Sequence, residues 1–304
     1  MPAALRPWGI PLLLTGLAWW QPLALYLVAL ACCGLPHVGW ELAWLQQRGA
    51  LRLPRGLGVG LGAALLLQMG GRLGFALGGL DALGAVAADL FSLLILLGLG
   101  LLLMRSHAAR PALLALPLLA AALPLAALLS PDPQWAVGLV ILLSVAHNFT
   151  PLGLAAGLDS PDARRHVRRL FLLPLGLLLI PGTPSATPGP LAPAELGWLE
   201  HHWAPLPAGA FPALVLAQCL HYYAVLRLLP AGCAGWRGGP WQWVVLGLSA
   251  ALGLGFVWDF SASRRLYAVA SGLHAWLEWP VLLALLAGPG ALSTWPSASP
   301  PAES

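Results

Sequence analysis

The chain has 304 residues, of which 59% are hydrophobic and only 9% are charged, and its mean hydropathy is +0.80. A soluble protein of this length needs far more polar side chains to cover its core, so the composition excludes a water-soluble globular protein. All 15 basic side chains are Arg, and the net charge is +4. Spread over loops, this charge indicates membrane topology and headgroup contact, and it argues against nucleic-acid binding.

Apolar runs long enough to cross a bilayer follow one another along the chain. Residues 8–20 are apolar but short, and we expect an interfacial or half-spanning helix there. The expected spans cover residues 23–45, 56–79, 83–104, 112–129, 134–157, 170–187, 209–229, 241–258 and 264–287. The sequence therefore predicts an all-α, polytopic integral membrane helix bundle with about nine transmembrane helices, in the range of about 8–10.

Loop charge predicts the orientation of this bundle. Connections with several Arg side chains, such as residues 48–55 and 164–169, alternate with connections that have none, such as residues 188–207. Basic loops stay on the cytoplasmic side of a membrane, so we expect an inner (plasma) membrane protein with its N-terminus outside. Residues 1–288 would form one transmembrane domain, and the Pro/Ser-rich tail 289–304 would be cytoplasmic and disordered.

Four of the eight histidines fall inside expected spans, where an ionisable side chain is a functional candidate by default. The four spans all run from outside to inside, and each histidine lies at a similar distance from the inner end of its span. At about 1.5 Å rise per residue, the imidazoles share one slab of the bilayer. They are His37, His147, His221 and His274.

Two of these histidines have a carboxylate four residues later, in His37-Val-Gly-Trp-Glu41 and His274-Ala-Trp-Leu-Glu278. Positions i and i+4 share one face of a helix, so each pair presents two potential ligands to one neighbour. Imidazole with carboxylate suits iron, manganese or zinc, and open positions on such a centre support oxygen chemistry or hydrolysis; iron (Fe²⁺) is the ion that we expect. Glu41 and Glu278 would ligate the metal or orient the imidazoles, and Tyr222, beside His221, would contact the substrate or a ligand.

Two other functions use the same residues. Haem requires only two axial histidines, and a proton- or ion-coupled transporter can use buried His and Glu as a relay. The remaining buried polar residues have structural interpretations. We expect Arg72 to pair with Asp89, and Asp259 to cap the last helix. The two Trp residues inside the His-x-x-x-Glu motifs, at positions 40 and 276, point away from the ligand face and are expected to pack.

The stretch Gly34-Leu35-Pro36-His37 resembles the Gly-x-Pro-His-Gly segment of the bacterial β-carotene-cleaving dioxygenase family (Brp/Blh). His147, in Ser-Val-Ala-His-Asn-Phe, is similar to a second histidine of that family. The chain differs in having Gly39 one position late and Glu41 where the family has Asp. The resemblance implies a polytopic membrane dioxygenase that binds iron through intramembrane histidines and acts on a carotenoid. Together with the residue pattern, it predicts an oxygenase for a small hydrophobic substrate such as an isoprenoid or acyl chain, taken from the lipid bilayer.

Overall fold

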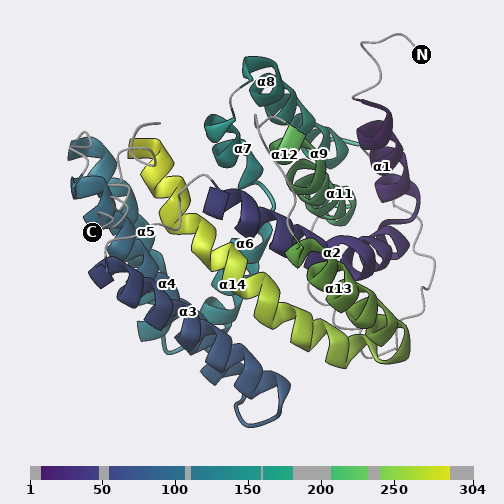
Figure 1. Cartoon of the computed structure of the whole chain (residues 1–304). Coiled ribbons are helices and arrows are strands. Elements are labelled where there is room, and N and C mark those ends of the chain that lie inside the picture. Colours follow the sequence, from purple (N-terminus) through teal and green to yellow (C-terminus); the bar gives the residue numbers. More distant parts are fainter. Residues whose placement is uncertain are drawn as a thin grey trace, which may run out of the picture. The chain divides into compact units, whose positions relative to one another are not determined.

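The computed structural model describes residues 8–47, 55–106, 111–158, 160–180, 207–231 and 240–287. Within these ranges every regular element is helical and no strand is present, as the sequence predicts. The elements are α1 (Gly9–Trp20), α2 (Pro22–Gln47), α3 (Arg55–Ala76), α4 (Ala82–Ser106), α5 (Pro111–Leu129), α6 (Pro133–His147), α7 (Pro151–Leu154), η2 (Ala155–Gly157), α8 (Pro161–Leu170), α9 (Leu172–Leu178), α11 (Ala210–Tyr223), η3 (Ala224–Leu228), α12 (Leu229–Ala231), α13 (Trp241–Trp258) and α14 (Phe260–Ala287) (Figure 1).

Six stretches of the described chain are long and apolar enough to cross a membrane. They are Pro22–Gln47, Gly56–Ala76, Ala82–Leu102, Pro133–Gly157, Ala210–Ala231 and Trp241–Trp258. These helices are consistent with a helical membrane protein, but the expected number of nine is not confirmed.

The three remaining predicted spans are not among these six. Helix α5 has 19 residues, Pro111–Leu129, and the apolar stretch described with its side chains is Pro117–Leu129. In the predicted span 170–187, the apolar helix is only Leu172–Leu178, and residues 181–187 lie outside the described ranges. The last predicted span, 264–287, lies within α14, which begins at Phe260 and has Glu278 and Pro280 inside it.

The chain divides into two compact units. The first unit comprises Met1–Trp40 and Ser144–Ser271, and the second comprises Glu41–Leu143 and Gly272–Ser304. The boundaries fall inside α2, α6 and α14, so each of these helices contributes to both units. The predicted tail 289–304 lies outside the described ranges.

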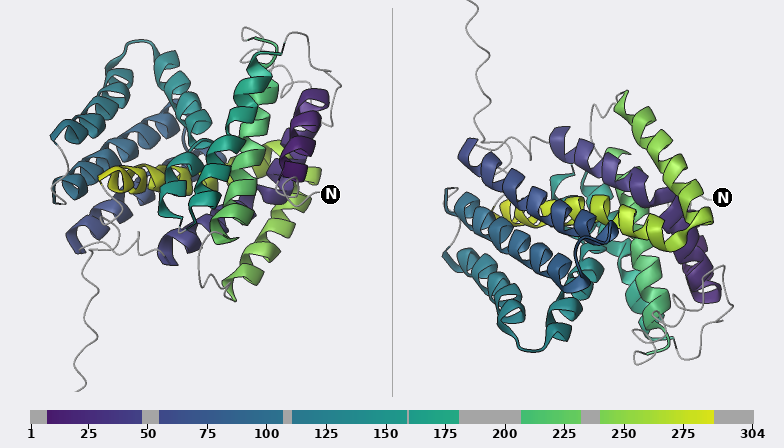
Figure 2. Two further views of the ribbon diagram at one scale, coloured as in Figure 1. Left: turned by 90° about the horizontal axis from the view of Figure 1, so that it is seen from above. Right: turned by 90° about the horizontal axis from the view of Figure 1, so that it is seen from below.

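In the first unit, α11 packs against α9 and α1 (Figure 2). Helix α11 is buried along most of its length, as expected of a helix that is apolar on every side. One apolar cluster of this unit is formed by Ala29, Val215, Cys219 and Tyr222, and a second by Leu30, Phe256 and Tyr267. Asp259 accepts a hydrogen bond from the backbone N–H of Ala262 at 2.9 Å, which confirms its predicted role as the cap of α14.

In the second unit, α3, α4 and α5 follow one another as antiparallel neighbours and lie side by side (Figures 1 and 2). The turn between α3 and α4 depends on Gly78, whose φ of 76° is a conformation that side chains disfavour. The two helices approach so closely that a Cβ atom on Gly71 would lie 2.5 Å from the Cβ of Ala88. Small residues of this kind allow tight packing of membrane helices.

Arg72 and Asp89 directly follow Gly71 and Ala88, the two residues in contact between α3 and α4. The Arg72 guanidinium pairs with the Asp89 carboxylate at 2.9 Å, as the sequence predicts. The indole N–H of Trp276 donates to the backbone carbonyl of Asp89 at 2.8 Å. The Arg72 guanidinium also lies 5.7 Å from the centre of the Trp276 ring. Trp276 therefore fixes the C-terminal half of α14 to α3 and α4, which confirms its expected packing role.

Candidate metal centre

His37 lies on α2, one residue after Pro36, which is inside the helix. Its Nδ1 atom lies 3.1 Å from the carbonyl oxygen of Cys33. Because a carbonyl oxygen only accepts hydrogen bonds, this contact requires the proton on Nδ1 and leaves the lone pair of a neutral ring on Nε2. The backbone of α2 thus prepares His37 to bind a ligand through Nε2.

The glycines around His37 let other helices of the first unit approach α2. A Cβ atom on Gly34 would lie 3.0 Å from the Tyr267 ring, and one on Gly39 would lie 2.8 Å from the methyl groups of Val245. A side chain at either position would push α14 or α13 away from α2. The Gly-Leu-Pro-His-Val-Gly segment is therefore a packing surface as well as a ligand position.

His147 is the last residue of α6, and the chain turns directly after it. Both the backbone N–H and the hydroxyl of Thr150 donate to the His147 carbonyl, at 3.0 Å and 2.7 Å. Pro151 then starts the short helix α7. The turn holds the end of α6, so the His147 ring is presented from a helix terminus.

His221 lies near the end of α11, just before the π-helical turn η3. Pro230 follows, and it offers no N–H to the carbonyl of Leu226 one turn earlier. Single π-helical turns inside helices occur often at functional sites. The wider turn begins three residues after His221 and sets the direction in which the rest of this segment leaves the site.

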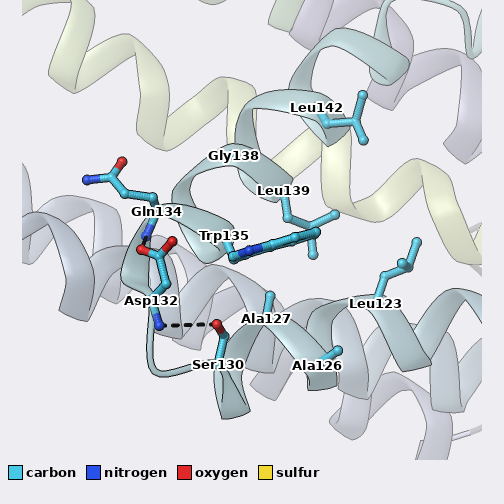
Figure 3. Close-up of a pocket in the computed structure, with 10 residues that line it drawn as sticks. All are labelled: Leu123, Ala126, Ala127, Ser130, Asp132, Gln134, Trp135, Gly138, Leu139 and Leu142. Atoms are coloured by element: carbon cyan, nitrogen blue, oxygen red, sulfur yellow. Dashed lines mark hydrogen bonds between the residues drawn. The ribbon is translucent and has the colours of Figure 1, made fainter.

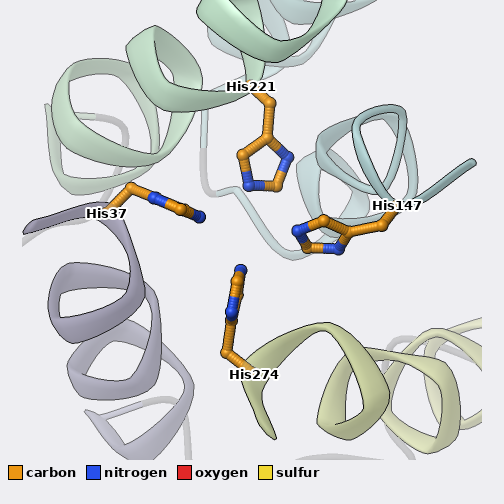
Figure 4. Close-up of side chains that lie close together, drawn as sticks. All are labelled: His37, His147, His221 and His274. Atoms are coloured by element: carbon orange, nitrogen blue, oxygen red, sulfur yellow. The ribbon is translucent and has the colours of Figure 1, made fainter. Parts of the chain in front are cut away.

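These three histidines form one buried group within the first unit, which we call the three-histidine cluster. Their exposed fractions are 1% for His37, 8% for His147 and 0% for His221. The ring centre of His221 lies 5.1 Å from that of His37 and 4.6 Å from that of His147. One ring nitrogen from each side chain lies within 4.8 Å of the others. Figure 4 shows the three rings directed toward one another from different helices.

Tyr222 borders the three-histidine cluster. Its ring lies 4.2 Å from the His37 ring at an interplanar angle of 32°. Its hydroxyl accepts from the amide of Gln218 at 2.9 Å and lies 3.2 Å from the Tyr267 hydroxyl. Tyr222 is 5% exposed and Tyr267 is 8% exposed, so the hydroxyl pair is buried. This arrangement restrains the His37 ring.

Our sequence reasoning missed Tyr267 and Gln218. Tyr267 precedes His274 by seven residues on α14, which is two helical turns and the same face, so the helical spacing contained this signal. Gln218 gave no comparable signal.

The second unit holds the other predicted site residues, Glu41, His274 and Glu278, which we call the carboxylate cluster. Their exposed fractions are 0%, 1% and 0%. One ligand atom from each side chain lies within 4.8 Å of the others. His274 and Glu278 are one turn apart on α14, and Glu41 comes from α2. Both clusters therefore contain a residue of α2, since Glu41 follows His37 by one helical turn.

The donor atoms of the three-histidine cluster suit a metal ion. Metal–nitrogen bonds are about 2.0–2.1 Å, so the nitrogens around an ion are separated by about 3–3.5 Å. Separations within 4.8 Å require shifts of about 1 Å, well within side-chain freedom. Neutral imidazoles bind iron, zinc and copper, and their burial keeps competing water away.

The other four histidines lie away from these clusters or outside the described ranges. His166 is half-buried on α8, where its ring meets the Trp8 ring edge-on at 5.2 Å. Burial lowers the pKa of His166 below its ordinary 6.5, and the nearby Arg169 lowers this pKa further. His107, His201 and His202 are outside the described residues.

A separate groove of about 620 Å³ lies in the second unit between α5 and α6. Figure 3 shows Leu123, Trp135 and Leu142 along its apolar part, with Ser130 and Asp132 at one end. Its lining contains none of the predicted ligands. The groove therefore does not belong to either cluster.

No protein-family model, no curated protein and no solved structure matches the chain. The buried histidines therefore carry the functional argument by their own geometry.

Proposed function

We propose that the protein is an integral membrane oxygenase that holds a non-haem iron ion in the three-histidine cluster and oxidises a lipid-soluble substrate. The observation that carries the proposal is the convergence of three buried imidazoles inside apolar helices, with ligand nitrogens within 4.8 Å of one another. An isolated buried histidine is explained by packing, but three that converge make a ligand set. Glu41, His274 and Glu278 of the carboxylate cluster are the other potential ligands, since one ligand atom from each lies within 4.8 Å of the others.

The resemblance of Gly34-Leu35-Pro36-His37 to the Brp/Blh family supports a carotenoid or another isoprenoid as substrate. In the reaction that this resemblance implies, O₂ adds across one carbon–carbon double bond, the bond breaks, and both oxygen atoms end in two carbonyl groups. An acyl chain is the other substrate class that an apolar membrane site accommodates. Bound iron would supply the dioxygen chemistry that protein side chains lack.

The chain's own residues prepare the site for this chemistry. The Cys33 carbonyl fixes the tautomer of His37, so Nε2 faces the cluster. Tyr222 covers one face of the His37 ring and is held in turn by Gln218 and Tyr267. The apolar surroundings exclude water and favour a substrate that arrives from the bilayer.

We further propose that the protein resides in the inner (plasma) membrane, with its N-terminus outside and its C-terminus in the cytoplasm. The support is the alternation of Arg-rich and Arg-free connections along the sequence. Cysteine-accessibility labelling from either side of intact cells tests this orientation, with the Arg-rich segment 164–169 expected to be reached only from inside.

Metal analysis of the detergent-purified chain tests the proposed function. We expect about one equivalent of iron or more in the wild type, and the loss of one equivalent in a His37→Ala/His221→Ala variant. His166→Ala is the matched control, because it removes a histidine outside both clusters and should leave the metal content unchanged. Metal-free wild-type protein would exclude the oxygenase.

The alternatives give different signals in the same preparation. A proton or ion relay is favoured by Glu41 and Glu278, which are buried in membrane helices, and it predicts metal-free protein with pH-driven transport in vesicles. A haem protein predicts a Soret absorption band that His37→Ala removes.

A further inference from the structure

The carboxylate cluster has a donor set of its own. We infer that Glu41, His274 and Glu278 bind a divalent cation, in addition to the ion proposed for the three-histidine cluster. This inference rests on the proposed function for the first ion. The second site is argued from residues of the second unit alone.

The donor geometry of the carboxylate cluster matches a cation. Three atoms within 4.8 Å of one another surround a point that is at most about 2.8 Å from each of them. Metal–oxygen and metal–nitrogen bonds are about 2.0–2.2 Å, so small rotamer shifts would bring all three donors into coordination. Two carboxylates with one imidazole form a harder ligand set than three imidazoles, and such a set favours Mn²⁺ or Fe²⁺.

The charge balance of the cluster also fits a divalent ion. Glu41 and Glu278 are both completely buried, and their oxygens lie within 4.8 Å of each other. Two ionised carboxylates this close repel each other strongly where the dielectric constant is low. One divalent cation balances both charges, and the neutral His274 adds a ligand without adding charge.

Packing on the opposite side of α14 fixes the direction of these ligands. Trp276 lies about 200° around the helix from both His274 and Glu278, and its indole is hydrogen-bonded to the Asp89 carbonyl. At Gly272, a Cβ atom would lie 2.7 Å from the Arg72 side chain, so α14 approaches α3 closely there. Sites built on helices held in this way position their ligands accurately.

Stoichiometric binding of Co²⁺ to the full-length, metal-depleted protein in detergent tests the second site, because Co²⁺ accepts imidazole and carboxylate ligands. Elemental analysis after gel filtration should give about two Co²⁺ per chain in the wild type. We expect about one in Glu41→Gln and in Glu278→Gln, with a changed visible d–d spectrum. Asp259→Asn, the same chemical change at an exposed helix cap, should retain both ions.

A His37→Ala/His221→Ala variant separates this inference from the proposed function. We expect it to lose the first ion and to keep the one bound by the carboxylate cluster. One ion in the wild type that survives Glu278→Gln would overturn the second site and leave the histidine site standing. One ion that survives the double histidine variant but not Glu278→Gln would overturn the histidine site instead, and no bound ion would overturn both. Circular dichroism and gel filtration identify any misfolded variant. If either Glu41→Gln or Glu278→Gln misfolds, the other variant tests the carboxylate cluster.

Discussion

The hydroxyl groups of Tyr222 and Tyr267 lie 3.2 Å apart, and they join α11 to α14 directly behind the His37 ring. We expect Tyr267→Phe to lower the free energy of unfolding by about 1 kcal/mol, because one buried hydrogen bond is lost while Gln218 still donates to Tyr222. The metal content should stay at the wild-type value. Thermal unfolding in detergent, followed by metal analysis, measures both effects. A Tyr267→Phe protein without metal would contradict this supporting role.

Two adjacent glycines on α3 provide a matched test of helix packing. A Cβ atom at Gly71 would lie 2.5 Å from the Cβ of Ala88, whereas a Cβ at Gly70 would meet nothing within 4 Å. We expect Gly71→Ala to destabilise the protein by roughly 1–3 kcal/mol, because α3 and α4 must separate. Gly70→Ala should be neutral or stabilise by up to about 1 kcal/mol, because Ala favours the helix. Equal unfolding midpoints for the two variants would exclude the close crossing.

The partly buried ion pair between Arg72 and Asp89 is expected to be sensitive to loss of one partner. Asp89→Asn removes the negative charge beside the guanidinium, and we expect a loss of stability at or below the roughly 3–5 kcal/mol of a fully buried pair, because the Arg72 side chain is 16% exposed. The exposed pair between Asp162 and Arg165 is the control, and Asp162→Asn should change stability by less than about 0.5 kcal/mol. Chemical denaturation in mixed micelles measures the free energy of unfolding of the Asp89→Asn and Asp162→Asn variants. Replacing both Arg72 and Asp89 by apolar residues should recover part of the loss.

Protonation of His166 should make stability depend on pH. Its pKa is lowered in the folded protein, so below about pH 6.5 the unfolded chain binds more protons than the folded chain. The contribution of His166 to stability is therefore complete above this pH and decreases as the pH falls toward the folded pKa. We expect the unfolding midpoint to drop more between about pH 7.5 and about pH 5.5 in the wild type than in His166→Phe. Parallel pH profiles would show that His166 does not cause the dependence.

The sequence allowed the helical class and the residues of both clusters to be predicted because buried ionisable residues are rare in apolar segments. The i, i+4 spacing of His274 and Glu278 placed two ligands on one face, and the structure brings them together. Hydropathy alone was a poorer guide to the number of spans. It does not show that the described apolar helix within the predicted span 170–187 is Leu172–Leu178.

Tertiary contacts were harder to predict. The pairing of Arg72 with Asp89 followed from their similar distances in sequence to the turn at Asp81. The Tyr222–Tyr267 contact, in contrast, joins two helices that are far apart in sequence. The packing role of Gly34 and Gly39 could not be predicted either. A glycine at a close helix contact can be recognised only when the neighbouring residues in the structure are known. Packing of this kind depends on the partner helices and not on local pattern.

The three-histidine cluster also determines when the site can form during biosynthesis. His37 enters the membrane with α2, early in translation, whereas His221 arrives with α11 after most of the chain has been made. A metal ion therefore meets a complete ligand set only after insertion is nearly finished. An ion that binds the assembled chain and not its unassembled helices would stabilise the mature protein. The fraction of the chain that matures, and the fraction that is degraded, would then depend on the metal supply.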